Sequence, residues 1–503
     1  MAQEPGQDER TDILDRVFDR AIRITHKVGL KKPSRWLSGI QMKRWLEARH
    51  SVARDDEDNE RTTPPDDEHI ELHSVWIAEV YPPSSSKALG DALRRLPRGG
   101  IVRDQDLVDD VARARRYPLG GWWWNLGVFY NKAGDRRVPG SDAIELPPQV
   151  DHLLLTMYLV TPSLACAVGQ FVLNDSAASN IESTLRRRYA TEGVRSRDGS
   201  VRVRDPLTFK RELVASAIDE LHDDCKAWFG RNLPGAFCDG LLEDQLPACY
   251  FLTLDKVRPL TDEARLDYLD PLGVDAGYMA LASDDLPGLR LSQPVGVNRR
   301  PHTLYLAGKT DEMFPDDDVL GGHGRGRGGF TVALHMKLNR FIAMWGLERA
   351  LLGYEMAFGR LRDSFSASHG SSIRRSLASL GVASSNIAQL GGDAHAVARD
   401  AQRLARDRHA FERELVTFRP VQPEMWRLEG TWTDVMRDDI AMSAERVRDI
   451  EASARDLEVT RASMISTKTN LSLQVSLRRL TIFLVVLTVV LVVIAWATLD
   501  AMN

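Results

Sequence analysis

The sequence predicts an α+β protein, in which a mixed cytoplasmic α/β domain is followed by a helical region, a long stalk helix and one C-terminal transmembrane helix. Short apolar runs bounded by Gly, Pro and Asp fill the first two thirds of the chain, a pattern typical of short strands and helices. From residue 331 onward the apolar residues recur at helical spacing. Residues 480–499 then carry no charge and no Gly or Pro. Mixed elements first and helices afterwards favour α+β architecture over a doubly wound sheet.

The apolar segment at residues 480–499 is the most informative feature of the chain. Its length as a helix is about 30 Å, the thickness of the hydrocarbon core of a bilayer. A buried core helix is seldom apolar on every face, and a signal peptide would lie at the other end of the chain. Arg478 and Arg479 precede the segment, while no cation follows it. This asymmetry predicts a single-pass protein of the cell inner membrane, in contact with the lipid bilayer and with a cytoplasmic N-terminus.

The amino-acid composition narrows the choice of cellular compartment and of binding partners. A chain of 503 residues has room for two or three domains. Its net charge of -5 argues against a nucleic-acid-binding role for the whole protein. Lysine supplies only 12 of the 66 basic residues, a bias that suggests a GC-rich bacterial genome. The 4 cysteines do not make a disulfide framework in so long a chain, and they fit a reducing cytoplasm.

The first 70 residues are predicted to hold two segments. Residues 1–54 form a basic helical arm, with apolar residues at helical spacing and Arg and Lys between them. The arm either contacts anionic lipid or docks as an ordinary amphipathic helix, and its aspartates at positions 12, 15 and 19 favour docking. Residues 55–70 are acidic and contain two prolines, so they are expected to form a solvated linker.

Residues 71–315 are predicted to form the α+β cytoplasmic domain. Strands are expected at residues 73–80, 153–160, 165–172, 248–254 and 303–307. Helices are expected after the serines at 84–86 and at residues 106–115, 175–188 and 206–229. The apolar stripe of the last helix is expected to comprise Phe209, Leu213, Ala217, Leu221 and Trp228. A Gly-rich loop at residues 316–330 follows the domain.

Residues 331–430 are predicted to be helical, with Gly391 and Gly392 as an interruption. After Gly430 the sequence contains no Gly or Pro, so one helix about 110 Å long is expected, with residues 431–479 as its stalk. The heptad seam of the stalk comprises Met436, Ile440, Val447, Ile450, Ala454, Leu457, Met464, Leu471 and Val475, interrupted by Ser443, Arg461 and Lys468. A partly polar seam of this kind is typical of a multi-helix stalk and predicts a homo-oligomer.

Residues 448–490, RDIEASARDLEVTRASMISTKTNLSLQVSLRRLTIFLVVLTVV, carry the stalk into the apolar segment. This stretch resembles the stalk and first membrane helix of the CorA family of magnesium channels. The resemblance implies an oligomer and Mg²⁺ as the conducted ion, with Met502 and Asn503 at the outer mouth of the pore. The family carries Gly-Met-Asn and then a second membrane helix, whereas here Ala501 replaces the Gly and the sequence stops at Asn503. Without the second membrane helix, self-association through the stalk is the part of the resemblance that is retained.

Four residues have the side chains of zinc ligands. These are His222, Cys225, Cys238 and Cys249, but their spacing matches no zinc knuckle. Cys225 falls four residues after Leu221, on the apolar stripe of the 206–229 helix. Buried thiols are the preferred interpretation, and no metal site is predicted.

Two glycine motifs bear on phosphate binding. Ala307-Gly308-Lys309-Thr310 lacks the glycine that a phosphate loop carries five positions before its second glycine, where Thr303 stands. Gly324-x-Gly326-x-x-Gly329 lacks the strand that precedes a dinucleotide-binding loop. Arg325 and Arg327 in this loop are the candidate anion-binding residues, for a nucleotide or a phosphate, against the alternative of a loop without a ligand. Three aspartates at 316–318 attract a divalent cation or are simply solvated, and the second interpretation is preferred.

Trp122, Trp123 and Trp124 are consecutive, so they cannot all face one way in a strand. At least one of them is expected to meet solvent, a partner or a ligand. The sequence contains no HExxH, GxSxG or Cys–His nucleophile signature, so no catalytic residue and no cofactor are predicted.

These features lead to one functional hypothesis and two alternatives. The hypothesis is a membrane-anchored cytoplasmic sensor or effector that oligomerises through the stalk helix and couples a cytoplasmic signal to the membrane. One alternative is a CorA-like oligomer that conducts divalent cations, with Mg²⁺ as its ion. The other is a tail-anchored enzyme with an unrecognised site.

Overall fold

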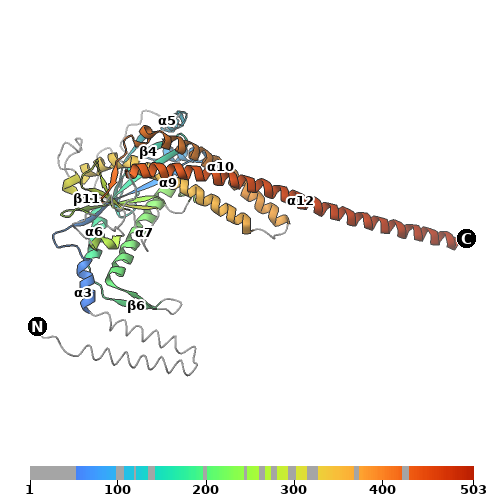
Figure 1. Ribbon diagram of the computed structural model, residues 1–503, viewed down its shortest axis with the longest axis horizontal. Coiled ribbons are helices and arrows are strands. Elements are labelled where there is room, and N and C mark those ends of the chain that lie inside the picture. Colours follow the sequence, from blue (N-terminus) through green and yellow to red (C-terminus); the bar gives the residue numbers. More distant parts are fainter. Residues whose placement is uncertain are drawn as a thin grey trace, which may run out of the picture.

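The computed structural model describes residues 52–97, 107–117, 121–133, 142–195, 201–242, 246–259, 267–272, 280–292, 302–313, 327–367, 373–421 and 430–502. The predicted arm at residues 1–54 lies outside these ranges except for its last three residues. The described chain forms a mixed sheet with helices on both faces, and its last helix extends far beyond the body (Figure 1).

Ten strands of the described chain form one sheet in the order β12-β9-β10-β11-β8-β1-β5-β4-β2-β3. Their bounds are β1 Ile70–Tyr81, β2 Trp122–Asn131, β3 Asp142–Ile144, β4 Val150–Thr161, β5 Leu164–Leu173, β8 Ala248–Leu254, β9 Leu281–Ser283, β10 Leu289–Ser292, β11 Thr303–Lys309 and β12 Phe418–Pro420. Neighbouring strands are antiparallel except for the parallel pairs β8–β11 and β2–β3. The five strands expected from the sequence all form, and β4 and β5 pair as an antiparallel hairpin. A small separate hairpin consists of β6 Glu192–Arg195 and β7 Val201–Arg204.

The helices of the described chain are α3 Val52–Arg61, α4 Ser86–Arg95, α5 Leu107–Ala114, α6 Asp175–Arg186, α7 Pro206–Asn232, α8 Thr310–Met313, α9 Arg327–Ala367, α10 Ile373–Arg406, α11 Arg408–Glu412 and α12 Trp432–Met502. The described chain also has two 3-10 helices: η1 Pro83–Ser85 directly precedes α4, and η2 Asp267–Leu272 lies between β8 and β9. Asn174 caps the start of α6, where its side chain accepts a hydrogen bond from the Ala177 amide. Asp205 does the same for α7 from the Thr208 amide.

The central strands are buried on both faces because α7 and α9 cover opposite sides of the sheet. On one face Phe171 of β5 packs edge-on against Trp228 of α7, with ring centroids 5.7 Å apart. On the other face the Cα of Gly346 in α9 approaches the sheet, and a Cβ there would lie 3.3 Å from both the Ala78 Cβ and the Cys166 Sγ. Alternation along a strand produces this division, since residues 166 and 171 point to opposite faces. The sheet is therefore the middle of three layers.

The buried face of α7 agrees with the prediction at Leu221 and Trp228 but is shifted by one residue in the first half of the helix. Val214 and Ile218 are buried, whereas Leu213 is 43% exposed. The helix has apolar residues on adjacent faces, so the expected stripe through Leu213 and Ala217 was not the only one consistent with helical spacing. The observed face also buries Lys210 completely.

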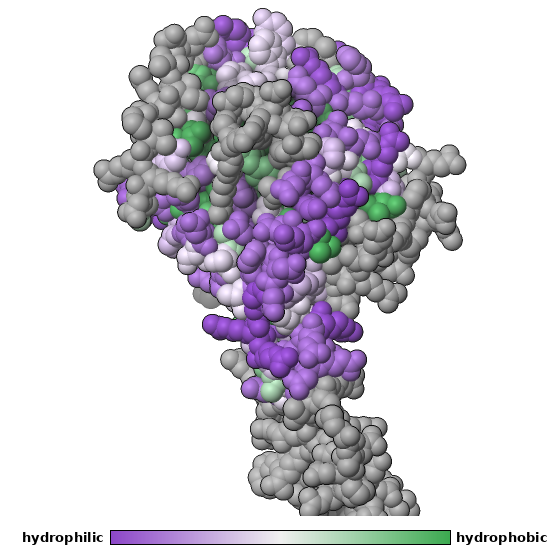
Figure 2. All heavy atoms as spheres, turned by 90° about the vertical axis from the view of Figure 1, so that its left-hand side faces the viewer, coloured by the Kyte–Doolittle hydropathy of each residue, from purple (hydrophilic) through white to green (hydrophobic). Residues whose placement is uncertain are grey.

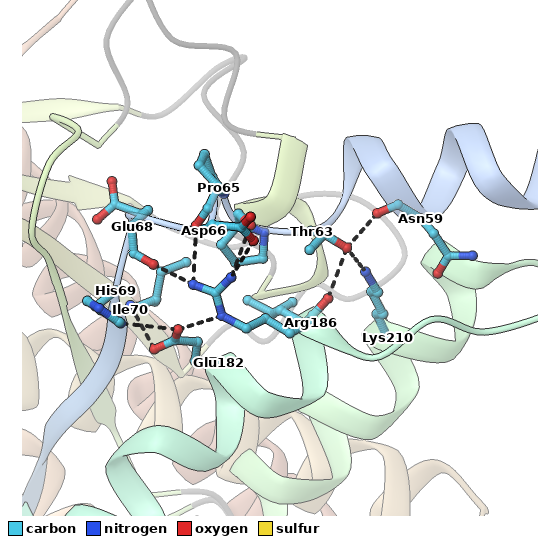
Figure 3. A network of polar contacts seen from close by, with 12 residues as sticks. Asn59, Thr63, Pro65, Asp66, Glu68, His69, Ile70, Glu182, Arg186 and Lys210 are labelled. Carbon is cyan, nitrogen blue, oxygen red and sulfur yellow. Dashed lines mark hydrogen bonds and ion pairs between the residues drawn. The ribbon is translucent and has the colours of Figure 1, made fainter.

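The predicted solvated linker at residues 55–70 is instead part of the folded body (Figure 3). Its first half continues α3, and the Nζ of Lys210 donates to the Thr62 carbonyl and to the Thr63 Oγ1, each at 3.1 Å. The Nη2 of Arg186 donates to the Glu68 carbonyl at 2.6 Å. The carboxylate of Glu68 accepts hydrogen bonds from three consecutive amides, those of residues 255–257. Composition indicated solvation, but each buried polar group here has a specific partner.

The helical layer also differs from the prediction in two places. α10 runs through Gly391 and Gly392 without a break, because Gly391 packs against α12, where a Cβ would lie 3.3 Å from the Glu451 Oε1. Residues 418–420 form β12 at the edge of the sheet, so the region predicted as helical contributes a strand as well. Residues 327–330 of the predicted Gly-rich loop belong to α9, and residues 316–326, with the three aspartates, lie outside the described residues.

The close approach of α9 to the sheet gives a testable pair of substitutions. Gly346→Leu is expected to lower the free energy of unfolding by about 1–3 kcal/mol, because the side chain has no space against Ala78 and Cys166. Gly359→Leu on the same helix is the matched control, since nothing lies within 4 Å of its Cβ position. Urea denaturation of the two variants in detergent measures the difference, and equal stabilities would contradict this packing of α9.

Candidate functional site

The start of α12 is fixed by reciprocal hydrogen bonds between Thr431 and Asp434. The Asp434 carboxylate accepts from the Thr431 amide at 3.1 Å and from its hydroxyl at 2.8 Å, while the Asp434 amide donates to the Thr431 Oγ1 at 3.2 Å. This arrangement is a capping box, in which residues three apart satisfy the free amides of the first turn. Burial opposes ionisation, but the Thr431 hydrogen bonds and the charges of Arg437 and Arg408 lower the pKa of Asp434.

The first part of α12 is buried within the chain. Met436, Ile440, Ala444, Val447 and Ala454 are at most 3% exposed, and the helix packs against both α10 and α9. All of them except Ala444 belong to the predicted heptad seam. The first half of this seam thus packs inside one chain, which corrects the expectation that the whole seam faces partner helices.

The second part of α12 leaves the body as a single helix (Figure 1). Residues 462–498 are a candidate membrane span by length and composition, with a mean hydropathy of 3.0 in the most apolar window and none of that window buried. Arg478 and Arg479 are exposed on this part of the helix. Met502 is the last residue of α12, and Asn503 lies outside the described residues. The structure therefore confirms one apolar helix at this end of the sequence.

The short helix α11 links the start of α12 to the body through alternating charges. The Arg408 Nε donates to the Glu412 Oε1 at 2.5 Å, and the Arg408 Nη2 lies 3.5 Å from the Asp434 Oδ1. Arg437 lies 3.5 Å from Glu412 and 3.2 Å from Asp434. Single exposed ion pairs contribute little, but a network of four residues fixes the orientation of one helix against the other.

A cleft of about 400 Å³ lies beyond α11, where β2, β4 and α9 meet the segment that joins α11 to β12. Its lining comprises Trp123, Thr156, Tyr158, Asp285, Met336, Lys337, Asn339, Glu414, Leu415 and Val416. This volume lies within the range of small-molecule sites. The face of the body shown in Figure 2 is mainly hydrophilic, with hydrophobic residues only in separate places.

The floor of the cleft is a chain of three buried polar side chains. The Asn339 Nδ2 donates to the Thr156 Oγ1 at 3.3 Å, and the Thr156 Oγ1 lies 2.9 Å from the His335 Nε2. Burial lowers the pKa of His335 to about 3, so its ring is neutral and its Nε2 shares a hydrogen bond with the Thr156 hydroxyl. The Asn339 Oδ1 is buried and has no hydrogen-bond partner among the described residues.

The walls and rim of the cleft carry an aromatic ring and charges. Trp123 is 45% exposed, while Tyr158 is almost buried, and burial raises the pKa of its hydroxyl to about 12, which keeps it protonated. Lys337 and Glu414 lie at the rim, and the Asp285 carboxylate accepts a hydrogen bond from the Thr417 amide at 2.6 Å. Glu414 has a φ of 58°, which is rare for a residue with a side chain. Such backbone strain is concentrated at functional sites.

The structure does not bring the zinc-ligand candidates of the sequence together, and it describes no side chain of the anion-binding candidates. Cys225 and Cys249 are buried, the His222 Nε2 bonds to the Leu246 carbonyl, and no group of potential metal ligands occurs among the described residues. Arg325 lies outside the described residues, and Arg327 is the first residue of α9, with no described side chain. Gly308 lies within β11 and not in a phosphate loop, as the sequence indicated.

The cleft itself was missed in the sequence, although two signals point toward it. Trp122 and Trp123 are both about half exposed, which confirms that at least one indole of the triplet meets solvent. Asn339 and His335 lie among the apolar residues of α9, where polar side chains need partners inside the protein. Comparisons with protein families, with curated proteins and with solved structures find no match to this chain.

The neutral His335 predicts a pH dependence of stability. In the unfolded chain its pKa returns to about 6.5, so acidification protonates the unfolded state first and folding stability is lost as the pH falls from 6.5 toward 3. Between pH 6.5 and 5 the loss from this residue is about 2 kcal/mol. His335→Gln keeps a hydrogen-bonding group near Thr156 and does not titrate, so its denaturation free energy is expected to vary less over this range. Identical slopes for the two proteins would contradict the neutral, buried ring.

Proposed function

We propose that this protein is a membrane-anchored cytoplasmic sensor or effector, in which α12 couples the state of the body to the bilayer. One observation carries the proposal: a single helix is buried in the body at residues 436–454 and, within the candidate span at residues 462–498, exposes an uncharged apolar stretch from residue 480 onward that is long enough to cross a membrane. A shift of α9 or α10 therefore moves the same rigid element that enters the lipid. Helix shifts of this kind are an established means of switching.

The orientation follows from the charges that flank the apolar stretch. Arg478 and Arg479 stand on its body side, and cationic flanks remain in the cytoplasm. The 4 cysteines are all free thiols, which is in keeping with a reducing compartment. The cell inner membrane, with the body in the cytoplasm, is accordingly the proposed location.

Self-association is proposed for the part of α12 between the body and the apolar stretch. Met464, Leu471 and Val475 continue the heptad seam and are 64%, 62% and 46% exposed. A single helix gains little stability without packing for its apolar face. A second copy of the same helix supplies the same seam. The resemblance to the CorA stalk supports self-association in this proposal, and ion conduction is not part of it.

The proposed seam predicts that two charges will dissociate the oligomer. Full-length protein in detergent is expected to have the mass of a defined oligomer by light scattering. The double substitution Met464→Glu, Leu471→Glu is expected to raise the dissociation constant by about 100-fold or more, because both charges enter a packed seam.

The matched control places the same charges away from the seam. Val459 and Leu473 are 69% and 56% exposed and both occupy the outer heptad position, so Val459→Glu, Leu473→Glu is expected to leave the oligomer intact. A monomeric wild-type protein, or equal dissociation of both variants, would show that the seam does not drive association.

A further inference from the structure

We infer that Glu79 and the loop of residues 233–242 form a proton-controlled latch between the two helical layers of the body. The closed loop encloses the protonated carboxyl group of Glu79, and loss of the proton favours opening of the loop. Cytoplasmic protons are then the signal that the body passes to α12, and this role alone rests on the proposed function. The latch itself depends only on contacts within the body.

The loop of residues 233–242 runs from α7, on one face of the sheet, to α9, on the other. It follows the last residue of α7 directly. At its far end the Leu242 carbonyl accepts a hydrogen bond from the Arg360 Nη2 of α9 at 2.7 Å. A Cβ at Gly353 of α9 would lie 2.9 Å from the Leu242 Cβ, so loop and helix are in close contact. Opening of the loop therefore removes contacts from α9.

Glu79 lies near the end of β1, and the loop buries it completely. Its Oε1 accepts hydrogen bonds from the Val80 amide at 2.8 Å and from the Phe237 amide at 3.0 Å, and its Oε2 accepts from the Cys238 amide at 2.9 Å. The loop approaches closely at Gly235, where a Cβ would lie 2.7 Å from the Glu79 Cγ and Cδ. The loop closes only by removing this carboxyl group from water.

The groups around the carboxyl group do not neutralise a negative charge. Tyr81 on the same strand and Cys166 on β5 are buried, and burial raises the pKa of both, so they carry no charge near pH 7. In the loop, Cys238 is adjacent and Asp239 is exposed, and both act on the same cluster. Lys226 of α7 acts on the Cys238 thiol. No cation forms an ion pair with the carboxyl group within the described part of the chain.

The proton balance gives the direction of the latch. Burial raises the pKa of Glu79 from its ordinary value of 4.5 to about 7, although the hydrogen bonds from Cys238, Phe237 and Val80 oppose the shift. In an open loop the carboxyl group returns to water and to its ordinary pKa. The closed state therefore binds the proton more tightly, and rising pH favours the open state. For one group with these two pKa values, the opening equilibrium constant increases about tenfold between pH 6 and pH 8.

The stretch of α9 that contacts the loop also contacts α12. Glu355 lies between Gly353 and Arg360, and its Oε1 is 3.7 Å from the Nη1 of Arg446. Arg446 belongs to the part of α12 that packs within the body. An open loop thus releases α9 beside one of its contacts with the membrane helix.

Amide hydrogen exchange tests the latch in the full-length protein in detergent, at pH 6, 7 and 8 and with correction for the intrinsic exchange rates. Protection of residues 233–242 is expected to fall about tenfold from pH 6 to pH 8. Glu79→Gln has a side chain that does not titrate, so its loop protection is expected to be the same at all three pH values, whatever its absolute level.

Asp239→Asn is the matched control, because it removes an exposed carboxylate from the same loop and is expected to keep the wild-type pH dependence. The wild-type series decides the matter even where a substituted protein fails to fold. Protection that is constant or rises with pH in the wild type would overturn the inference, and so would a Glu79→Gln protein that keeps the wild-type dependence. Either result would leave the oligomer measurement unaffected, whereas a responsive loop in a monomeric protein would support the latch and count against the stalk.

Discussion

The packing of α12 residues 436–454 against α9 and α10 is the constraint on which the rest of the account depends. Because these turns are buried, their packing against the body sets the direction in which the exposed part of α12 extends. Burial of apolar side chains at residues 436, 440 and 447 stabilises this attachment, and large-to-small changes at such positions cost about 2–5 kcal/mol. The capping box at Thr431 fixes where the helix starts. A helix held at one end in this way can report a rearrangement of its neighbours to a distant membrane.

Local patterns in the sequence were sufficient for most of the elements. Alternation and apolar runs predicted β1, β4, β5, β8 and β11, and the absence of Gly and Pro after Gly430 predicted α12. Tertiary packing accounts for the errors. Gly391 is tolerated within α10 because α12 lies against it, and the acidic 55–70 segment folds because Glu68 finds three backbone amides far along the chain. Neither partner is visible in a local window of sequence.

The cleft could not be predicted for the same reason. Trp123 on β2 is separated by more than two hundred residues of chain from Asn339 on α9, and Glu414 lies further on, between α11 and β12. Only the tertiary packing of these segments brings the three residues to one cleft. The sequence did indicate exposure for the tryptophan triplet. It carried no sign that the Asn339 Oδ1 would be left without a partner, because that follows from the hydrogen bonds of Thr156 and His335.

The central claim, that α12 is one continuous helix from the body to the bilayer, is tested most directly by amide hydrogen exchange along residues 432–479 of the full-length protein in lipid. The account predicts strong protection at residues 436–454 and protection that continues without a gap through residues 456–479. Rapid exchange confined to residues 456–479, with protected segments on either side, would show that the helix is broken there. The body would then be tethered to the membrane but not mechanically coupled to it.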